Sequence, residues 1–363
     1  MSISSFLTDI LRGKGSFPGG VHPFEGKSLT ENKSPEPCPM PSQVFIPVAQ
    51  HIGAPAKPVV EKKAVVKKGQ PIAEAGGFVS SPIHSPVCGT VAKVETSSFP
   101  AFRPIPTIII DVDPQADDWF DGLPAPLDPQ TATPDELKAR VSWAGIVGLG
   151  GATFPTQVKL SPPKGKAIEL VVINGAECEP YLTSDYRMML ERPDDLIGGL
   201  KILMKIVGAK GGVIAIEDNK PEAIKVLSAK TDADETLTVR SMPVKYPQGG
   251  EKQLIQALTG REVPSGAAGT ADTGVLVQNV NTAVAVFDAV TKGRPLIERI
   301  VTVTGDGVEK PGNYSTRIGT PLRHLLTHAG LKKGIKHIIC GGPMMGLSRS
   351  EEHTSELQSR ITI

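Results

Sequence analysis

A strand, a helix and a second strand follow one another in the middle of the chain at a spacing that few folds permit. Residues 168–174, IELVVIN, form a short apolar run of strand-like composition. The stretch PDDLIGGLKILMKIVGA from Pro193 is a predicted helix, and GGVIAIED from Gly211 is a predicted strand. Because such a β-α-β succession builds parallel sheets, the sequence predicts an α/β domain, which a third strand at 236–240 continues.

A strong helix start precedes this core. Thr133 stands at the predicted N-cap, Pro134 follows at the first helical position, and Glu136 completes a capping box. Gly145 is suited to end the helix, because glycine adopts the left-handed conformation found after a helix C-terminus.

Changes in composition predict six segments. Short apolar runs with turns before the linker indicate a small all-β unit, and its VKKGQPIAE and SPVCGTV stretches resemble the barrel-sandwich hybrid fold of lipoyl and biotinyl carriers. A predicted hairpin and short helix after the α/β core resemble a β-grasp module. The predicted segments are an extended leader that wraps over a neighbour (1–42), the barrel-sandwich domain (43–113), a linker (114–131), the α/β domain (132–293), the β-grasp-like module (294–347) and a tail (348–363).

The barrel-sandwich unit lacks the lysine that a carrier domain modifies. Its corresponding hairpin, SPIHSPVCG, offers His84 and Cys88 instead. Two isolated ligands are too few for a metal site, so packing within the hairpin is the favoured interpretation and no metal site is predicted.

Composition excludes several classes of function. With 39 basic and 38 acidic residues the net charge is +1, which gives no electrostatic reason to expect nucleic acid as a partner. The four cysteines are widely spaced, which favours a reduced cytosolic setting over a disulfide scaffold. The most apolar region, 196–216, contains three lysines and does not predict a membrane span.

A glycine-rich loop, GLGGATFPTQVK, follows the first predicted helix. Gly148, Gly150 and Gly151 allow backbone N–H groups to approach an anion, and Lys159 can add a positive charge. By itself this loop is better described as a glycine helix end followed by a turn. It matches neither the P-loop nor the dinucleotide fingerprint.

A second motif makes the binding interpretation stronger. NGAECEP, residues 174–180, directly follows a predicted strand, and carboxyl ends of parallel strands are where open α/β sheets bind ligands. YPQGGE (246–251) and QNVNT (278–282) add two further polar or glycine-rich ends. The order and spacing of the four motifs predict a single ligand site.

Together with GGVHPFEGKSLT, IPVAQHIGAPAKPVV and GGPMMG, these motifs make the chain resemble the RnfC family of the Rnf ion-translocating electron-transport complexes over roughly residues 15–347. Its middle domain is similar to the NADH- and FMN-binding flavoprotein subunit of respiratory complex I. The resemblance implies a Rossmann-like parallel sheet between the barrel-sandwich domain and a β-grasp-like SLBB module.

The resemblance also implies a set of cofactor-binding residues. The glycine loop would surround FMN, with Phe154 stacked on the nicotinamide nucleotide; the second motif would line flavin and nicotinamide; and the last would hold the ribityl phosphate side. Glu177 would orient the nucleotide and not act as an acid or base. The implied residues are Gly148, Gly150, Gly151, Phe154, Lys159, Asn174, Glu177, Glu179, Tyr246, Gly249, Glu251, Asn279, Val280 and Thr282. Thr153 and Ala176 depart from the flavoprotein pattern of glycine and acid.

The implied function is that of an oxidoreductase subunit that passes hydride between NAD(H) and FMN, with the flavin carrying the chemistry and no catalytic side chain. Implied partners are NAD(H) and the membrane-embedded and ferredoxin-like Rnf subunits, which would hold the chain on the cytoplasmic face of the bacterial inner membrane. Two alternatives stay open: a flavin-dependent cobalamin reductase with the same motifs, and a non-catalytic docking subunit with a vestigial flavin site.

The family pattern is expected to break after Leu347. Relatives continue into a ferredoxin-like domain that binds two 4Fe-4S clusters, whereas SRSEEHTSELQSRITI (348–363) contains no cysteine and resembles a non-native tail on a truncated frame. This sequence therefore offers no ligands for an iron–sulfur cluster.

Overall fold

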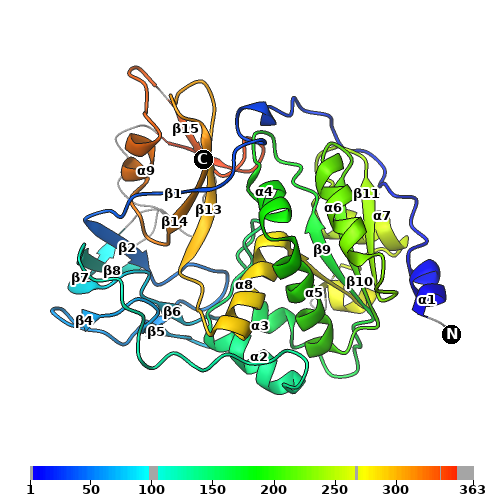
Figure 1. Cartoon of the computed structure of the whole chain (residues 1–363), viewed down its shortest axis with the longest axis horizontal. Helices are drawn as coiled ribbons and strands as arrows, with labels where there is room; N and C mark the ends of the chain where they lie inside the picture. Colours follow the sequence, from blue (N-terminus) through cyan, green and yellow to red (C-terminus); the bar gives the residue numbers. More distant parts are fainter. Residues whose placement is uncertain (1–2, 98–104, 266–268, 336, 350–363) are drawn as a thin grey trace.

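A parallel four-stranded sheet forms the centre of the molecule in the computed structural model, which describes residues 3–97, 105–265, 269–335 and 337–349 (Figure 1). The strand order is β11-β10-β9-β12, and all neighbouring pairs are parallel. The strands are β9 (Leu170–Gly175), β10 (Gly211–Glu217), β11 (Leu237–Met242) and β12 (Val275–Asn279). The predicted α/β core is confirmed.

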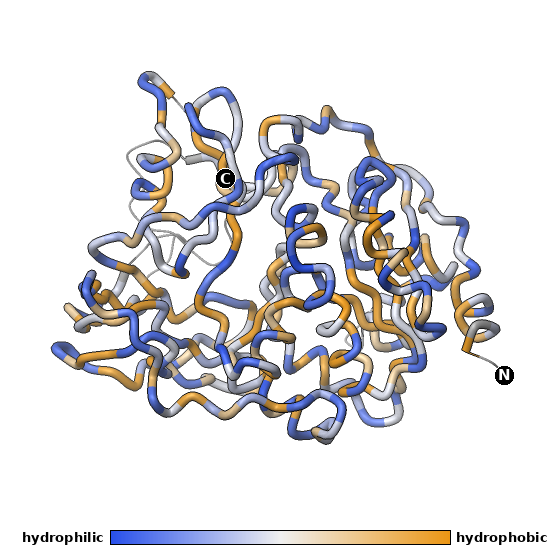
Figure 2. The backbone as a smooth tube through the Cα atoms, in the orientation of Figure 1, coloured by the Kyte–Doolittle hydropathy of each residue, from blue (hydrophilic) through white to orange (hydrophobic). Residues whose placement is uncertain are grey.

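Helices cover both faces of this sheet, because successive strand residues point to opposite sides. Val171 and Ile173 pack with the larger group of helices, whereas Leu170 and Val172 pack with α1 and α7. Figure 2 shows hydrophobic segments running through this interior. The larger group is α2 (Pro134–Trp143), α4 (Ser184–Glu191), α5 (Pro193–Val207), α6 (Pro221–Thr231) and α8 (Val280–Lys292); the opposite face carries α1 (Ile3–Ile10) and α7 (Glu251–Thr259).

The start and end of α2 follow the sequence prediction. Thr133 and Glu136 form a complete capping box. Gly145, just past the helix, has φ +69°, the left-handed conformation that glycine adopts at low cost. The chain then enters the glycine loop, which leads into the short helix α3 (Thr156–Lys159).

The order in which the chain adds strands to the sheet reverses at the β9–β12 boundary, although all the strands are parallel. From β9 the chain moves outward to β10 and β11, and then returns to add β12 on the other side of β9. Asn174 and Asn279 lie opposite each other at the carboxyl ends of these two strands. This reversal is the position at which open α/β sheets place their ligand crevice.

The N-terminal β unit consists of two small sheets around an aliphatic core. Val44, Ile72, Val91 and Ile108 are among its fully buried residues. One sheet has the order β2-β8-β7-β4 and the other β3-β5-β6. The strands are β2 (Gln43–Pro47), β3 (Lys57–Pro58), β4 (Val65–Val66), β5 (Pro71–Glu74), β6 (Ile83–His84), β7 (Gly89–Ser97) and β8 (Ile105–Val112).

The C-terminal module contains the predicted hairpin and short helix. β13 and β14 pair antiparallel, and α9 packs on them through Leu322 and Leu325. Its elements are β13 (Glu298–Val303), β14 (Gly312–Arg317), α9 (Leu322–His328), β15 (Ile338–Cys340) and β16 (Leu347–Arg349). The last two residues of β16 belong to the predicted tail, and residues 350–363 lie outside the described part.

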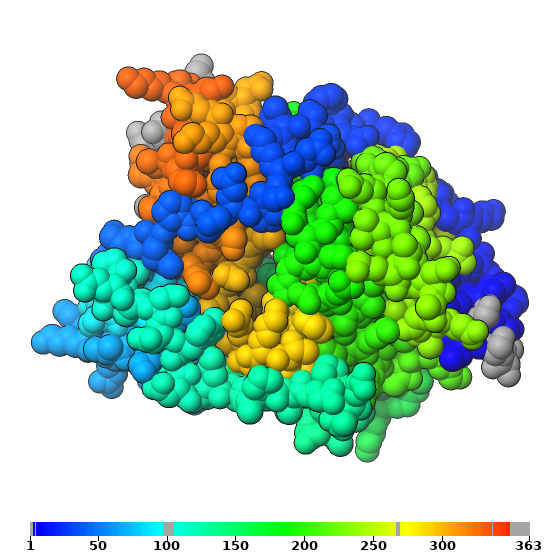
Figure 3. Space-filling model, viewed as in Figure 1, coloured from blue at the N-terminus to red at the C-terminus, as the bar shows by residue number. Residues whose placement is uncertain are grey.

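The leader is not wholly extended as predicted. Its first residues form α1, whose Leu7 and Ile10 are buried in the core beside α7. From there it crosses the upper surface of the molecule in Figure 3, and β1 (Glu36–Pro37) pairs with β14. Among the helices described, none is long and apolar enough to span a membrane.

Candidate functional site

Hydrogen bonds join the four sequence motifs at the carboxyl edge of the parallel sheet. The Leu149 N–H donates to Thr282 Oγ1 at 2.9 Å, which ties the glycine loop to α8. Asn174 Nδ2 donates to the Gly249 carbonyl at 2.8 Å, which ties the loop after β9 to the loop after β11. These bonds join the motifs in pairs, and a bond from Lys159 to Glu251 joins the two pairs. The motifs are thus parts of one site, although they are spread over more than a hundred residues of sequence.

A backbone hydrogen bond joins the two ends of the glycine loop. The Gly148 N–H donates to the Phe154 carbonyl at 2.9 Å, and the Phe154 side chain is half-buried. Gly151 has φ +139° and no atom within 4 Å of an added Cβ, so it borders open space. Thr153 has φ +48°, in the left-handed region that glycine adopts at lower cost than threonine.

Lys159 does not offer the free charge that its motif suggests. Its Nζ donates to Glu251 Oε1 at 2.7 Å and to the Val277 carbonyl at 2.6 Å. The two predicted residues therefore form an ion pair between α3 and the first residue of α7. A ligand phosphate at this position would have to share Lys159 with Glu251, or rely on backbone N–H groups and helix N-termini.

Gly249 is required by close packing against the loop after β9. A Cβ at this position would lie 2.3 Å from the Ala176 carbonyl oxygen. The Gly249 N–H donates to Cys178 Sγ at 3.3 Å. Burial raises the pKa of Cys178 to about 11, so this thiol stays neutral. The half-buried Tyr246 lies on the same loop.

The two glutamates of NGAECEP hold structure on either side of the site. The buried Glu177 carboxylate accepts the Asp185 N–H at 2.8 Å and the Tyr186 N–H at 3.4 Å, so it caps α4. Glu179 Oε2 accepts the Met344 N–H of the C-terminal module at 3.0 Å, and burial raises the pKa of this carboxyl. Substitution of Glu177 is therefore expected to disturb the start of α4.

The N-terminus of α8 is organised by Asn279 and by Asp185, a residue that the motifs do not include. Asn279 Oδ1 accepts the Asn281 N–H at 2.8 Å and caps α8, while its Nδ2 donates to Asp185 at 2.6 Å. Asn281 Nδ2 donates to the same carboxylate at 2.5 Å. Burial, and next Glu177, raise the pKa of Asp185 to about 7. Val280 is fully buried in the core, which leaves only its backbone for a ligand.

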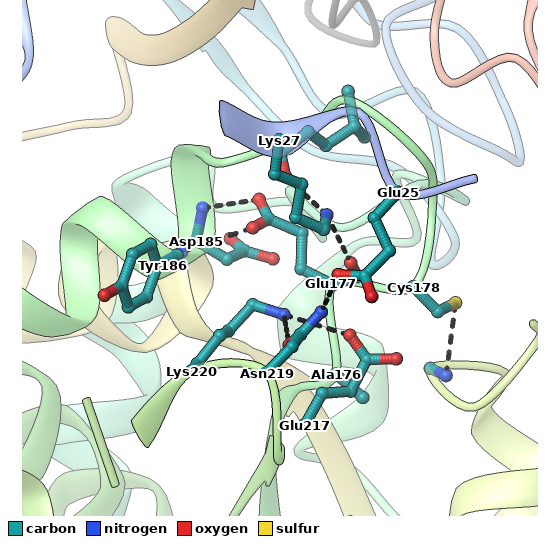
Figure 4. A network of polar contacts seen from close by, with 12 residues as sticks. Glu25, Lys27, Ala176, Glu177, Cys178, Asp185, Tyr186, Glu217, Asn219 and Lys220 are labelled. Atoms are coloured by element: carbon teal, nitrogen blue, oxygen red, sulfur yellow. Dashed lines mark hydrogen bonds and ion pairs between the residues drawn. The ribbon is translucent and has the colours of Figure 1, made fainter. Parts of the chain in front are cut away.

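Several residues that complete the site are not among the cofactor-binding residues predicted from the sequence. Lys27 of the leader donates from Nζ to three carbonyls of the loop after β9. At the end of β10, Glu217 and Lys220 form a buried ion pair of 3.0 Å (Figure 4). A strand-end position is the signal that marks Glu217, and the stretch GGVHPFEGKSLT contains Lys27.

The site fits a polar, phosphate-bearing ligand such as FMN. Within the described residues, buried side-chain atoms of the site loops lack hydrogen-bond partners, although buried polar groups are normally paired. These atoms are Thr153 Oγ1, Thr156 Oγ1, Gln248 Nε2 and Oε1, Gln278 Nε2 and Glu217 Oε1. Open space beside Gly151 provides room for a ligand to approach the backbone of the glycine loop closely. The residues present would thus suit the ribityl hydroxyls and phosphate.

His84 and Cys88 do not face each other as metal ligands. Cys88 Sγ donates to the Asp118 carbonyl at 3.1 Å, and the His84 ring packs edge-to-face on Trp143 at 4.8 Å. Burial lowers the pKa of His84 to about 3, so its ring is neutral. Each side chain thus contacts a segment outside the hairpin, His84 the helix α2 and Cys88 the linker. No group of three or more His, Cys, Asp or Glu side chains in the described regions is placed to hold a metal ion.

Thr282→Val is expected to lower the free energy of unfolding by about 1–3 kcal/mol and to loosen the glycine loop. The reason is that valine has the same shape but leaves the Leu149 N–H unpaired at a buried position. Chemical denaturation measures the loss, and hydrogen exchange of the Leu149 amide measures the loosening. Thr291→Val on the same helix is the matched control, because the Thr291 hydroxyl donates to the Phe287 carbonyl within α8. Equal stability of both variants would contradict the contact.

Comparison with known proteins agrees with this geometry. The family described as the Nuo51 FMN-binding domain matches residues 141–288, the RnfC barrel-sandwich hybrid domain matches 15–115, and the SLBB domain matches 300–348. The central domain is therefore of the FMN-binding class found in Nuo51.

Relatives along nearly the whole chain define the family. Component C of the proton-translocating ferredoxin:NAD(+) oxidoreductase complex of Clostridium ljungdahlii is 46% identical over 92% of this chain and 73% of its own length. The Na(+)-translocating counterpart of Acetobacterium woodii is 42% identical over 92% of this chain and 75% of its own. The corresponding component of the ion-translocating oxidoreductase complex of Rhodobacter capsulatus is 44% identical over 92% of this chain and 64% of its own length. The chain belongs to the RnfC family.

A solved structure confirms the fold. An NAD+-reducing [NiFe]-hydrogenase in its air-oxidized state superposes with a TM-score of 0.54 at 23% identity, over 63% of this chain and 45% of that chain. This likeness concerns the α/β fold. The predicted architecture, with a barrel-sandwich domain, a flavoprotein-type core and an SLBB module, is confirmed.

Proposed function

We propose that this chain binds FMN and NAD(H) and passes hydride between them, as a subunit of a membrane-associated complex that couples NAD(H) and ferredoxin redox chemistry to ion translocation. The observation that carries the proposal is the meeting of four flavoprotein motifs at the switch point of a parallel sheet. Contacts from Leu149 to Thr282, Lys159 to Glu251 and Asn174 to Gly249 join the motifs there.

The protein's role in this reaction is to bind and orient. FMN, when bound, supplies a two-electron hydride acceptor that can release electrons singly. Gly148, Gly150 and Gly151 would let the backbone approach the phosphate, and Asn279 and Thr282 would hold the ribityl side. Asn174 and Glu179 would border the ring system, with Phe154 and Tyr246 as aromatic neighbours. A preorganised backbone of this kind contributes chiefly through positioning.

Gly148→Ala tests the glycine loop as the phosphate wall. An added Cβ at Gly148 has no atom nearer than 3.6 Å, so the free energy of unfolding should stay within about 0.5 kcal/mol of the parent. The same methyl group would stand where a ligand approaches the backbone, and FMN should bind about 10-fold more weakly. Quenching of flavin fluorescence on titration with apoprotein measures the dissociation constant.

Gly77→Ala is the matched control for this experiment. Its added Cβ also has no atom nearer than 3.6 Å, and it lies in the N-terminal β unit. The control should change neither stability nor FMN binding. If Gly148→Ala binds FMN as tightly as the parent, the loop does not form the phosphate wall.

The remaining expectations are consistent with membership in the RnfC family and belong to this proposal. Partners would be the other subunits of an Rnf complex, which would hold the chain at the cytoplasmic face of the membrane. The segment boundaries given from the sequence, with the α/β unit at 132–293, are proposed as the domain boundaries.

A further inference from the structure

We propose that residues 17–30 of the leader form a wall of the flavin site, and that Lys27 is the positioning residue that fixes the turn 177–182 within it. The inference rests on the proposed function, since it concerns the same site. It assigns a role to a segment that lies more than a hundred residues before the motifs. The leader would therefore be part of the binding machinery and not only a connection between modules.

The ammonium group of Lys27 donates all its hydrogen bonds to backbone carbonyls of one turn. Its Nζ donates to the carbonyls of Glu177 at 2.9 Å, Glu179 at 3.1 Å and Leu182 at 2.6 Å (Figure 4). An ammonium group has three donors, and all three are used here. The side chain is only 7% exposed, although most of the leader lies on the surface. A buried lysine satisfied entirely by one turn fixes the course of that turn.

Buried charges around Lys27 explain why a cation is tolerated there. Burial lowers the pKa of Lys27, but the carboxylates of Glu177, Glu217 and Glu25 oppose that shift, while Lys220 adds to it. Figure 4 shows these side chains gathered around the lysine. Because the surrounding charge balance depends on the ammonium, a neutral side chain of the same length cannot replace it.

The same leader segment also contacts the loops after the other two strands on this side of the sheet. Glu25 Oε2 accepts from Asn219 Nδ2 at 2.6 Å, next to the end of β10. Val21 exchanges two backbone hydrogen bonds with Tyr246, at 2.9 and 2.8 Å, in the loop after β11. One continuous segment thus ties three strand-end loops together, and two of those loops carry predicted flavin-site residues.

The consequence for the site is geometric. The carbonyls that Lys27 holds belong to Glu177 and Glu179, whose side chains cap α4 and meet the Met344 N–H. Removal of the three bonds would release this turn while leaving the sheet and the glycine loop unchanged. The flavin should then bind more weakly and in a less defined orientation.

Lys27→Met is the test variant, because methionine keeps most of the length of the side chain and removes the three donors. Fluorescence titration with FMN should give a dissociation constant about 10- to 100-fold higher than that of the parent chain. The visible circular dichroism of the bound flavin, measured at saturating FMN, should also change, and a purely structural residue would not alter it. Lys33→Met is the matched control, since the exposed Lys33 ammonium donates to the Pro311 carbonyl, away from the turn 177–182.

Far-UV circular dichroism and a thermal melt show whether each variant is folded. If Lys27→Met does not fold, Val21→Pro replaces it, because it removes one leader N–H while the Val21 side chain is 52% exposed. Weaker FMN binding by the folded variant supports the inference. Parent-like affinity and flavin dichroism in that variant would overturn it. Absence of FMN binding by the parent chain would overturn the proposed function instead.

Discussion

Gly249→Ala is expected to abolish measurable FMN binding and to lower the free energy of unfolding by about 2 kcal/mol or more. The added methyl group would lie 2.3 Å from the Ala176 carbonyl oxygen, and backbone cannot move aside as a flexible side chain can. The loops after β9 and β11 would therefore separate, and the bond from Asn174 to the Gly249 carbonyl would be lost. Chemical denaturation and retention of flavin on gel filtration measure the two effects.

The outcome of this substitution distinguishes close packing from a simple turn. Gly77→Ala again serves as the control, because its added Cβ meets nothing closer than 3.6 Å. If Gly249→Ala keeps parent-like stability and flavin, the two loops do not approach each other as described.

Lys220→Met is expected to lower the free energy of unfolding by about 3–5 kcal/mol, since it leaves the fully buried Glu217 without its ion-pair partner. The double variant Glu217→Gln/Lys220→Met should recover much of that loss, because the glutamine leaves no unpaired negative charge at position 217. Urea denaturation of the parent, the two single variants and the double variant gives the coupling energy directly.

An exposed pair provides the control for this cycle. Lys230 pairs with Asp194 at 2.7 Å, but their side chains are 36% and 77% exposed. Lys230→Met should cost at most about 1 kcal/mol, because surface pairs contribute little. A loss for Lys220→Met no larger than for Lys230→Met would show that Glu217 and Lys220 do not form a buried pair.

Local patterns in the sequence predicted the fold well where the structure depends on neighbouring residues. The capping box at Thr133, the glycine after α2, and the strands and helices of the parallel sheet follow from periodicity and from helix-end residues. The helix α1 was missed, although Phe6, Leu7 and Ile10 have helical spacing, because the proline- and glycine-rich stretch that follows dominates the leader.

The motifs identified the loops of the site but not the hydrogen bonds and ion pairs that join these loops to other segments. Lys27 and the Glu177 carbonyl are 150 positions apart, and Lys159 and Glu251 are 92 positions apart. No local pattern reports a contact over such a separation, because the fold of the intervening chain decides it. For this reason the motif predicts the positive charge of Lys159 but not its pairing with Glu251, and the contacts of Lys27 are visible only in the structure.

An anaerobic titration of the FMN-loaded chain with NADH tests the central claim most directly. The account predicts that NADH bleaches the visible absorption band of the flavin in proportion to the amount added, until one equivalent per bound FMN has been consumed. A chain that binds no FMN, or binds FMN that NADH leaves fully oxidised, would contradict the account.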